Sequence, residues 1–288
     1  MKNKPLHFSY EFFPPRSSEM SRRLWRSVGQ LERLNPSFFS MTYGALGSAR
    51  DISIDSAITM REETPVPVAA HLTCAGTTRA EIDAIATRLR DAGFNRLVAL
   101  RGDSDGGPEP GEQYRDAAEF VEGLLKIHDF DISVAAYPEV HPKAKSAEDD
   151  LVHLKRKLDA GATRAITQYF FDADRFLRFR DAAAAIGIEK PIVPGILPVH
   201  DYDKLCAFSQ RCGAPVPTMF AGMFEQVRHD PAGRHQLAVQ LAVELCERLA
   251  AEGVDHLHLY TLNLTDICLD ISLALGASHK PLKASSAA

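Results

Sequence analysis

Residues 131–161 read DISVAAYPEVHPKAKSAEDDLVHLKRKLDAG, and the class of fold follows from this segment. The apolar run Ile132–Tyr137 is typical of a buried strand. The apolar spacing of Ala147–Ala160 predicts an amphipathic helix, which Gly161 ends. A strand followed by a segment of helix length indicates a parallel sheet, because parallel neighbours need a crossover connection.

The same strand–helix unit recurs along the chain. We expect strands at Phe8–Phe13, Phe38–Tyr43, Val66–Thr73, Arg96–Arg101, Ile132–Tyr137, Arg164–Phe171, Ile192–Leu197 and His256–Leu262. We expect helices from a cap at Ser17 or Ser18 to Leu34, and at Ile52–Glu63, Arg79–Ala92, Tyr114–His128, Ala147–Ala160, Asp174–Ile186, Lys204–Cys212 and Asp266–Leu275. Eight such units in 288 residues favour an α/β fold of the closed (β/α)8 TIM barrel type over an open doubly wound sheet.

An additional segment interrupts the seventh unit. Pro215–Phe224 is typical of a loop with a short helix, and Asp230–Ala251 predicts a long amphipathic helix. The barrel should therefore carry a helical insertion before its last strand. We expect residues 1–276 to form a single catalytic barrel, and the small, polar segment 277–288 to be a disordered tail.

Composition excludes several classes of protein. The net charge of −5 offers no basic surface for nucleic acid. The five cysteines are odd in number and form no Cys-x-x-Cys pair, which indicates a reducing compartment. No signal-peptide core follows the first lysines, and no apolar stretch approaches the ~20 residues of a membrane helix. We therefore expect a cytoplasmic protein with no nucleic-acid or membrane partner.

Polar side chains gather at the expected strand ends, where barrel enzymes build their active sites. The residues concerned are Glu11, Thr42, Tyr43, His71, Arg101, Asp103, Tyr137, His141, Gln168 and Tyr260. Glu11 is the most informative, because it lies between Tyr10 and Phe12, and a charge in apolar surroundings is costly unless it is paired or used.

Each of these residues also has a structural explanation. Glu11 could be one partner of a salt bridge at the barrel mouth, and the Arg101–Asp103 run could be a turn with an internal ion pair. His71 alone is more often a hydrogen-bonded strand histidine. His256 and His258 share one face of a strand, but no third metal ligand is evident, so we favour a structural role and expect no metal.

Other motifs leave the chemistry open. The glycine-rich segment 102–111 lacks the spacing of a dinucleotide fingerprint, and the chain contains neither a P-loop nor a G-x-S-x-G nucleophile motif. The basic run Lys155–Lys157 is either a solvated helix face or an anchor for phosphate, and composition alone does not decide between them.

Eight runs taken together resemble one family. They are Glu11–Arg16 (EFFPPR), Thr42–Gly44 (TYG), His71–Cys74 (HLTC), Leu100–Asp103 (LRGD), Ala136–Pro142 (AYPEVHP), Gln168–Asp172 (QYFFD), Pro194–Pro198 (PGILP) and Tyr260–Asn263 (YTLN). In this order, each at the end of an expected strand, they resemble the catalytic barrel of the methylenetetrahydrofolate reductases in their short bacterial form. The resemblance extends over about residues 6–276.

The resemblance implies an FAD-dependent oxidoreductase of one-carbon metabolism and methionine biosynthesis. NADH or NADPH reduces the flavin and leaves, and 5,10-methylenetetrahydrofolate is then reduced to 5-methyltetrahydrofolate. The implied cofactor-binding residues are Thr42, Tyr43, Ala45, His71, Arg101, Gly102, Asp103, Tyr137, His141, Ala144, Asp150, His153, Arg156 and Lys157. The implied substrate-binding residues are Asp103, Gln168, Lys204, Phe208, Tyr260 and Leu262. We also expect a homo-oligomer.

The chemistry of this reaction explains two catalytic candidates. The methylene bridge accepts hydride only after a proton on N10 opens its ring to a cation. Glu11 is the natural general acid, because burial among aromatic side chains raises the pKa of a carboxyl group. Asp103 is expected to hold the pterin and to stabilise the cation.

Three positions depart from the family pattern. Leu264 stands where an arginine is expected, His153 where an asparagine is expected, and Lys204 where a glutamine is expected. The alternative functions are another flavin-dependent barrel oxidoreductase with a different substrate, and a degenerate barrel that only binds or scaffolds. The presence of Glu11, Asp103 and Gln168 argues against the scaffold.

Overall fold

The computed structural model describes residues 5–43, 48–102 and 112–279. The strands within these residues are β1 (His7–Phe12), β2 (Phe38–Met41), β3 (Val68–Thr73), β4 (Arg96–Leu100), β5 (Asp131–Ala136), β6 (Arg164–Thr167), β7 (Ile192–Val193), β8 (Gly195–Ile196) and β9 (His256–Tyr260). The helices are α1 (Ser18–Glu32), α2 (Ser48–Glu63), α3 (Arg79–Asp91), α4 (Ala117–Ile127), α5 (Ala147–Asp159), α6 (Ala173–Ala185), α7 (Tyr202–Cys212), α8 (Met219–Gln226), α9 (Pro231–Ala251) and α10 (Thr265–Ala274).

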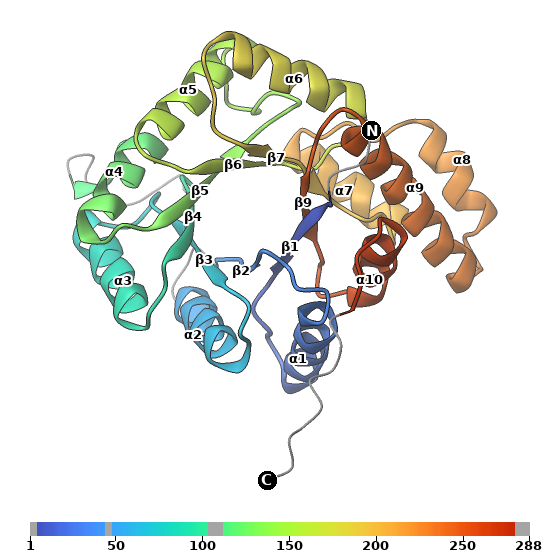
Figure 1. Cartoon of the computed structure of the whole chain (residues 1–288), viewed down its shortest axis with the longest axis horizontal. Coiled ribbons are helices and arrows are strands. Elements are labelled where there is room, and N and C mark those ends of the chain that lie inside the picture. The colour runs from blue at the N-terminus through green and yellow to red at the C-terminus, as the bar shows by residue number, and fades with distance from the viewer. Residues whose placement is uncertain (1–4, 44–47, 103–111, 280–288) are drawn as a thin grey trace.

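The strands form a ring with the helices outside it, which confirms the predicted α/β barrel (Figure 1). All the strand pairs are parallel, in the order β7-β6-β5-β4-β3-β2-β1-β9-β8. The expected seventh strand is split at Pro194, so that β7 pairs with β6 and β8 pairs with β9. Proline cannot donate to a ladder, but the Pro194 carbonyl still accepts a hydrogen bond from the His258 amide at 3.0 Å. One strand in two pieces therefore bridges the two ends of the sheet.

The sixth strand was predicted too long. It ends at Thr167, whereas the apolar run had suggested Phe171. The run is apolar for another reason, because Tyr169 packs with Leu197 and Phe220 beside the insertion, and Phe170 packs in the main core. Residues 169–171 are therefore apolar because their side chains are packed against other residues, and not because they belong to the sheet.

Helix ends follow local chemistry. Ser17 is the N-cap of α1 and accepts a hydrogen bond from the Met20 amide at 3.2 Å, which settles the choice between the two serines. Helix α4 begins later than expected because Asp116 caps it and accepts hydrogen bonds from the amides of Ala118 and Glu119.

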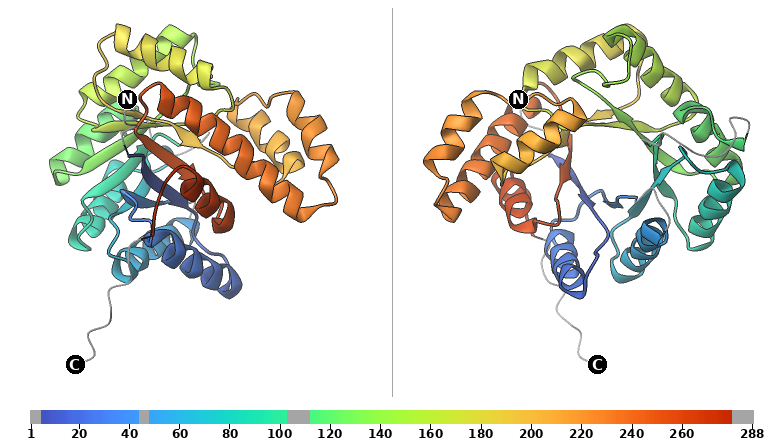
Figure 2. Two further views of the ribbon diagram at one scale, coloured as in Figure 1. Left: turned by 45° about the vertical axis from the view of Figure 1, so that its right-hand side comes forward. Right: turned by 180° about the vertical axis from the view of Figure 1, so that it is seen from behind.

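The predicted helical insertion is formed by α8 and the long helix α9, and it follows α7, the helix of the seventh unit. Its α8 end extends away from the ring in both views of Figure 2. It packs on α7 and on the ends of the strands through an apolar cluster that includes Leu205, Phe220 and Leu197. The prediction of a disordered tail falls mostly on residues 280–288, which lie outside the described residues.

Alternation along the strands separates two apolar layers. On β1, Phe8, Tyr10 and Phe12 face the surrounding helices, and the Tyr10 hydroxyl is hydrogen-bonded to Ser272 of α10 at 2.8 Å. The barrel interior is filled by Phe38, Ala69, Val98, Ile166 and Val193. Ser9 and Glu11 share the inner face of β1, so Glu11 reaches the carboxyl-terminal mouth of the barrel.

Candidate active site

A cavity of about 300 Å³ opens at the carboxyl ends of the strands, and we call it the mouth cavity. Nine predicted site residues line it, which are Glu11, Thr42, Tyr43, His71, Tyr137, Gln168, Phe208, Tyr260 and Leu262. The volume lies at the lower end of the range of small-molecule sites. The parallel barrel thus brings side chains from six separate strand ends to one place.

Glu11 lies between two histidines in the mouth cavity. Its Oε2 atom is 3.5 Å from Nε2 of His71 and 3.6 Å from Nε2 of His258. The side chain of Glu11 is only 19% exposed, and burial raises its pKa, an effect that His71 partly opposes. Burial also lowers the pKa of His71, and lowers that of His258 to about 3. Both histidines are therefore neutral near pH 7, and the geometry favours a protonatable acid over a salt bridge.

The segment after β9 holds Glu11 in place. Thr261 Oγ1 donates to the Glu11 carbonyl at 2.6 Å. Asn263 accepts from the Phe13 amide at 3.1 Å and donates to the Phe13 carbonyl at 2.9 Å. Leu262 and Asn263 adopt left-handed φ values of 47° and 54°. Sequence reasoning missed the clamping roles of Thr261 and Asn263, although asparagine is among the residues that tolerate this conformation best.

Tyr260 closes one wall of the mouth cavity. Its hydroxyl donates to the Thr167 carbonyl at 2.6 Å, which ties β9 to the end of β6. The ring lies against Gly195, where an added Cβ would be 2.6 Å from Tyr260 Cε2 and would also collide with the Thr167 carbonyl. Only glycine fits at this position, which gives the Pro-Gly-Ile run a physical reason.

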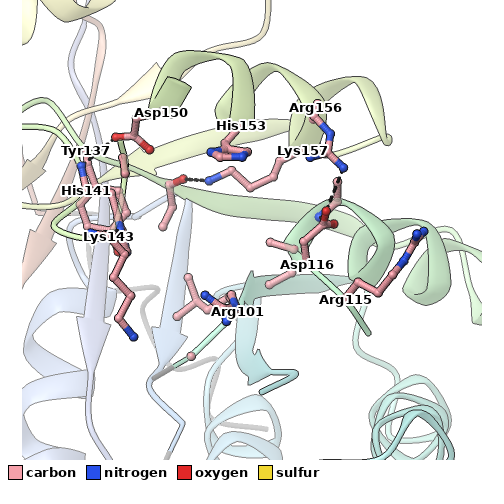
Figure 3. A pocket seen from close by; sticks show the side chains of 17 residues that line it. Arg101, Arg115, Asp116, Tyr137, His141, Lys143, Asp150, His153, Arg156 and Lys157 are labelled. Atoms are coloured by element: carbon pink, nitrogen blue, oxygen red, sulfur yellow. Dashed lines mark hydrogen bonds and ion pairs between the residues drawn. The ribbon is translucent and has the colours of Figure 1, made fainter. Parts of the chain in front are cut away.

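A second cavity of about 380 Å³, which we call the groove, adjoins the first (Figure 3). The two share Leu100, Ala135 and Tyr137 as lining residues. Nine predicted residues line the groove, which are Arg101, Gly102, Tyr137, His141, Ala144, Asp150, His153, Arg156 and Lys157. Sequence reasoning missed Arg115, Asp116 and Lys143, which also line it.

The charged helix α5 has two different sides. Lys157 points inward, and its Nζ donates to the Ala135 carbonyl at 2.6 Å. Burial lowers the pKa of Lys157 to about 8, an effect that Asp150 opposes. Arg156 also faces the groove, whereas Lys155 lies outside it and pairs with Asp159 at 2.9 Å. The basic run is therefore only partly a solvated face.

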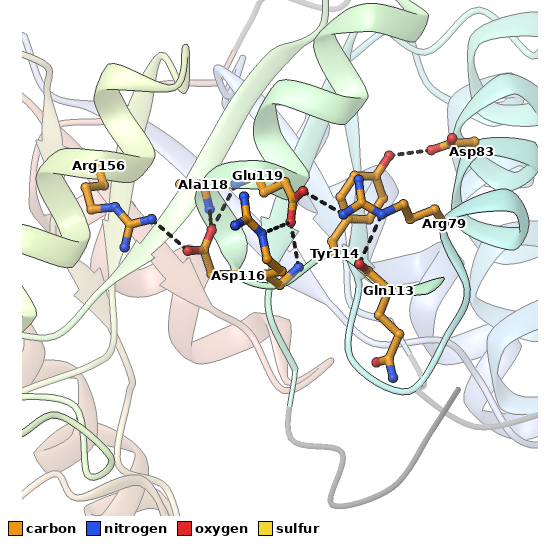
Figure 4. A network of polar contacts seen from close by, with 9 residues as sticks. Arg79, Asp83, Gln113, Tyr114, Asp116, Ala118, Glu119 and Arg156 are labelled. Carbon is orange, nitrogen blue, oxygen red and sulfur yellow. Dashed lines mark hydrogen bonds and ion pairs between the residues drawn. The ribbon is translucent and has the colours of Figure 1, made fainter. Parts of the chain in front are cut away.

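A polar network forms the rim of the groove (Figure 4). Arg156 Nη2 is 2.8 Å from Asp116 Oδ2, which links α5 to the cap of α4. Glu119 accepts hydrogen bonds from Arg79 at 2.6 Å and from Arg115 at 3.1 Å. These contacts hold the start of α4 against both neighbouring helices and so fix the width of the groove.

Of the predicted site residues that the structure describes, only Lys204 is not brought to either cavity. Lys204 lines neither of them, and its Nζ pairs with Asp201 at 2.8 Å in the first turn of α7. Its side chain is 80% exposed. Ala45 and Asp103 lie outside the described residues, so their roles stay predictions.

The described residues offer neither a metal site nor a membrane-spanning helix. Within residues 5–43, 48–102 and 112–279 no group of three His, Cys, Asp or Glu side chains is arranged to hold a metal. No described helix is long and apolar enough to cross a bilayer. Ser9 instead engages both strand histidines, through hydrogen bonds to His256 and His258.

Comparison with known proteins gives one consistent result. The profile of the family described as methylenetetrahydrofolate reductase matches residues 1–276. The 5,10-methylenetetrahydrofolate reductases of Pectobacterium carotovorum and Escherichia coli K12 are 44% and 43% identical to the chain, over 94% of it and 90% and 91% of their own lengths. The Zea mays enzyme is 34% identical over 93% of this chain but only 48% of its own length.

A solved structure supports the fold. A Clostridium thermocellum protein described as binding two copies of 5-methyl-5,6,7,8-tetrahydrofolic acid superposes with a TM-score of 0.69. The match covers 94% of this chain and 96% of that one. At 14% identity this is a likeness of architecture alone.

Proposed function

Because the chain belongs to the methylenetetrahydrofolate reductase family, we propose that it reduces 5,10-methylenetetrahydrofolate to 5-methyltetrahydrofolate with electrons from NADH or NADPH. The chain is an oxidoreductase of this family. We propose a ping-pong reaction in which the nicotinamide and the folate occupy the mouth cavity in turn. FAD, bound between the mouth cavity and the groove, would pass hydride from the first to the second.

The groove fits the polar part of such a cofactor. Arg101, Arg156 and Lys157 lie on its walls and would offset the charge of a pyrophosphate. The α5 side chains lie across the groove from Arg101 in Figure 3. Continuity between the groove and the mouth cavity at Tyr137 allows one ligand to extend from charged walls to apolar ones. These are the features that an elongated anionic cofactor with a flat ring needs.

The mouth cavity fits flat heteroaromatic substrates. Phe208 is 42% exposed and stacks on Tyr169, with ring centroids 5.9 Å apart and planes at 19°. It offers one face to a pterin or nicotinamide ring. Gln168 at the end of β6 supplies a polar edge in the same cavity. A binding role for Lys204 has no support in its position.

Glu11 is the proposed general acid. Ring opening of the folate needs a proton at N10, and burial keeps the Glu11 carboxyl protonated at a higher pH than a solvated glutamate. The hydrogen bonds that join Thr261 and Asn263 to the backbone of Glu11 and Phe13 hold the Glu11 carboxyl in the mouth cavity. Asp103 remains the proposed stabiliser of the cation. The proposals that the chain forms a homo-oligomer and that it takes part in methionine biosynthesis rest on its family membership alone.

The single observation that carries the proposal is the buried Glu11 carboxyl in a cavity continuous with a cationic groove. An anaerobic stopped-flow experiment tests it. The purified protein should be yellow, NADH or NADPH should bleach it, and 5,10-methylenetetrahydrofolate should restore the colour. Bleaching without reoxidation by the folate would indicate another flavin-dependent oxidoreductase. A colourless protein that does not bind added FAD would remove the cofactor assignment.

A further inference from the structure

A row of polar side chains runs through the barrel interior between β1 and β9. Nε2 of His256 is 3.0 Å from the Ser9 hydroxyl, and that hydroxyl is 2.7 Å from Nδ1 of His258. Nε2 of His258 is 3.6 Å from Oε2 of Glu11. The row follows from the strand register, which pairs Ser9 with His258 and Glu11 with Tyr260.

The two ends of the row reach different surfaces. Glu11 lies in the mouth cavity. His256 lines a third cavity of about 490 Å³ at the amino-terminal end of the strands, which we call the lower cavity. Ser9 and His258 between them have no exposed surface, and apolar side chains such as Phe38 and Val98 lie in the interior beside them. The row is therefore a continuous polar path through the buried interior of the barrel.

The hydrogen count of Ser9 couples the two histidines. A hydroxyl has one proton, so Ser9 donates to one ring nitrogen and accepts from the other. If Ser9 donates to His258, Nε2 of His258 carries a proton that faces Glu11. If Ser9 donates to His256, Nε2 of His258 is a bare acceptor. A change of tautomer at one histidine thus requires the same change at the other.

We propose that this row is a proton relay that returns to Glu11 the proton it gives to the substrate. The proposal rests on the proposed function, in which each turnover consumes one proton. Water in the lower cavity would protonate Nδ1 of His256, whose Nε2 proton passes to Ser9. The Ser9 proton passes to Nδ1 of His258, and the Nε2 proton of His258 passes to the Glu11 carboxylate.

The surroundings of His256 and His258 favour passing a proton along the row over holding it on either imidazole. Burial lowers the pKa of His256 and His258 to about 3 each. His7 and Arg164 add to the effect at His256, and Asp255 opposes it. Neither imidazolium is therefore stable enough to trap the proton. Nε2 of His258 has no hydrogen-bond partner among the described residues, and a shift of roughly half an ångström would bring it to hydrogen-bonding distance of Glu11.

Ser9→Ala is the central test, because it removes the middle hydroxyl and leaves Glu11 unchanged. Reduced holoenzyme is mixed anaerobically with 5,10-methylenetetrahydrofolate, and the first turnover is compared with the steady state. The first turnover uses the proton already on Glu11, so we expect a rate within about twofold of the wild type. Later turnovers should slow by at least about tenfold, because general acid catalysis contributes ~10²–10⁴-fold.

Ser40→Ala is the matched control. Ser40 is a buried serine paired with Glu11 in the β1–β2 register, and its hydroxyl has no hydrogen-bond partner among the described residues. Its loss should leave both phases unchanged. A second test replaces His256 with alanine and adds imidazole, which can enter the lower cavity and should restore the steady state of His256→Ala but not of Ser9→Ala.

Each outcome of these experiments either supports or overturns the proton relay. An unchanged steady state in Ser9→Ala would show that Glu11 is reprotonated from the mouth, and would overturn the relay. An equal loss in the first and later turnovers would make Ser9 a purely structural residue. If the wild type itself fails to transfer hydride to the folate, the proposed function fails and the relay with it. ¹⁵N NMR spectra of the histidines give a readout that needs no substrate. In the wild type, ionisation of Glu11 should change the tautomers of His256 and His258 together. In Ser9→Ala it should change the tautomer of His258 only.

Discussion

The mouth cavity and the groove adjoin each other, but they have opposite effects on the ionisation of the charged side chains that line them. In the mouth cavity Glu11 is buried beside two neutral histidines, and burial raises its pKa. In the groove Arg156 is half-exposed and paired with Asp116. A charge without a charged partner changes its protonation, whereas a solvated and paired charge stays ionised. One region is therefore suited to proton transfer and the other to binding an anion.

The largest expected effect comes from Glu11→Gln, which keeps the size of the side chain but removes the acid. The rate of hydride transfer from the reduced flavin to the folate should fall by ~10²–10⁴-fold, because no group delivers the proton. Reduction by NADH needs no such proton and should stay within about tenfold of the wild type. Stopped-flow traces of the two halves check this. An equal fall of both, with a lower melting temperature, would make Glu11 a structural residue.

The next largest effect concerns the groove. Arg156→Ala with Lys157→Ala removes two cations from its wall, and hydrogen bonds to charged groups contribute ~1.5–3 kcal/mol each. We expect FAD affinity to fall by at least about 100-fold, as judged by flavin absorbance after gel filtration and by calorimetry. Lys155→Ala is the control, since Lys155 pairs with Asp159 outside the groove. Full flavin occupancy in the double variant would reduce α5 to a solvated face.

Acid should destabilise the protein through the relay histidines. The folded-state pKa of His256 and His258 is about 3, below the 6.5 of a free histidine. Their contribution to stability is therefore present above pH 6.5 and is lost as pH falls towards 3, because the unfolded state binds the protons. Each histidine adds a slope of ~1.4 kcal/mol per pH unit in this window.

Urea unfolding at pH 7 and pH 5 measures this slope. His256→Gln can retain a hydrogen bond to Ser9 but cannot titrate, so its stability should change less between the two pH values. An identical pH dependence in the variant and the wild type would contradict the depressed pKa of His256.

A smaller effect is expected at the clamp after β9. Asn263→Ala removes two hydrogen bonds to the Phe13 backbone and leaves a residue poorly suited to φ 54°. We expect a loss of ~1–3 kcal/mol in the free energy of unfolding, with a lower rate in the folate half only. Asn263→Asp keeps the acceptor and serves as the control. A loss of stability with both half-reactions intact would show that the clamp does not position Glu11.

The smallest effect is expected at Lys204. Its ammonium pairs with Asp201 and lies outside both cavities. Lys204→Gln should leave the KM for the folate unchanged in steady-state assays. A raised KM would show that α7 approaches the substrate during turnover, and would restore the residue to the binding site.

The fold was largely predictable because strand and helix periodicities are local. The capping residue Ser17, the glycines at helix ends and the alternation of units all depend on neighbours within a few positions. The end of β6 was not predictable, since Tyr169 and Phe170 are apolar in order to pack and not to pair. The split of the seventh strand at Pro194 likewise depends on which strands lie on each side.

The site divides in the same way. The sequence by itself determined that titratable side chains stand at strand ends, and a parallel barrel must bring those ends to one mouth. It did not determine that Lys157 turns inward while Lys155 turns outward, or that Asn263 clamps Phe13. Only barrel closure placed Ser9 beside His258, 249 positions away. Periodicity is set by neighbouring residues, whereas distances between protons and their acceptors are set by register and burial, which exist only in the folded chain.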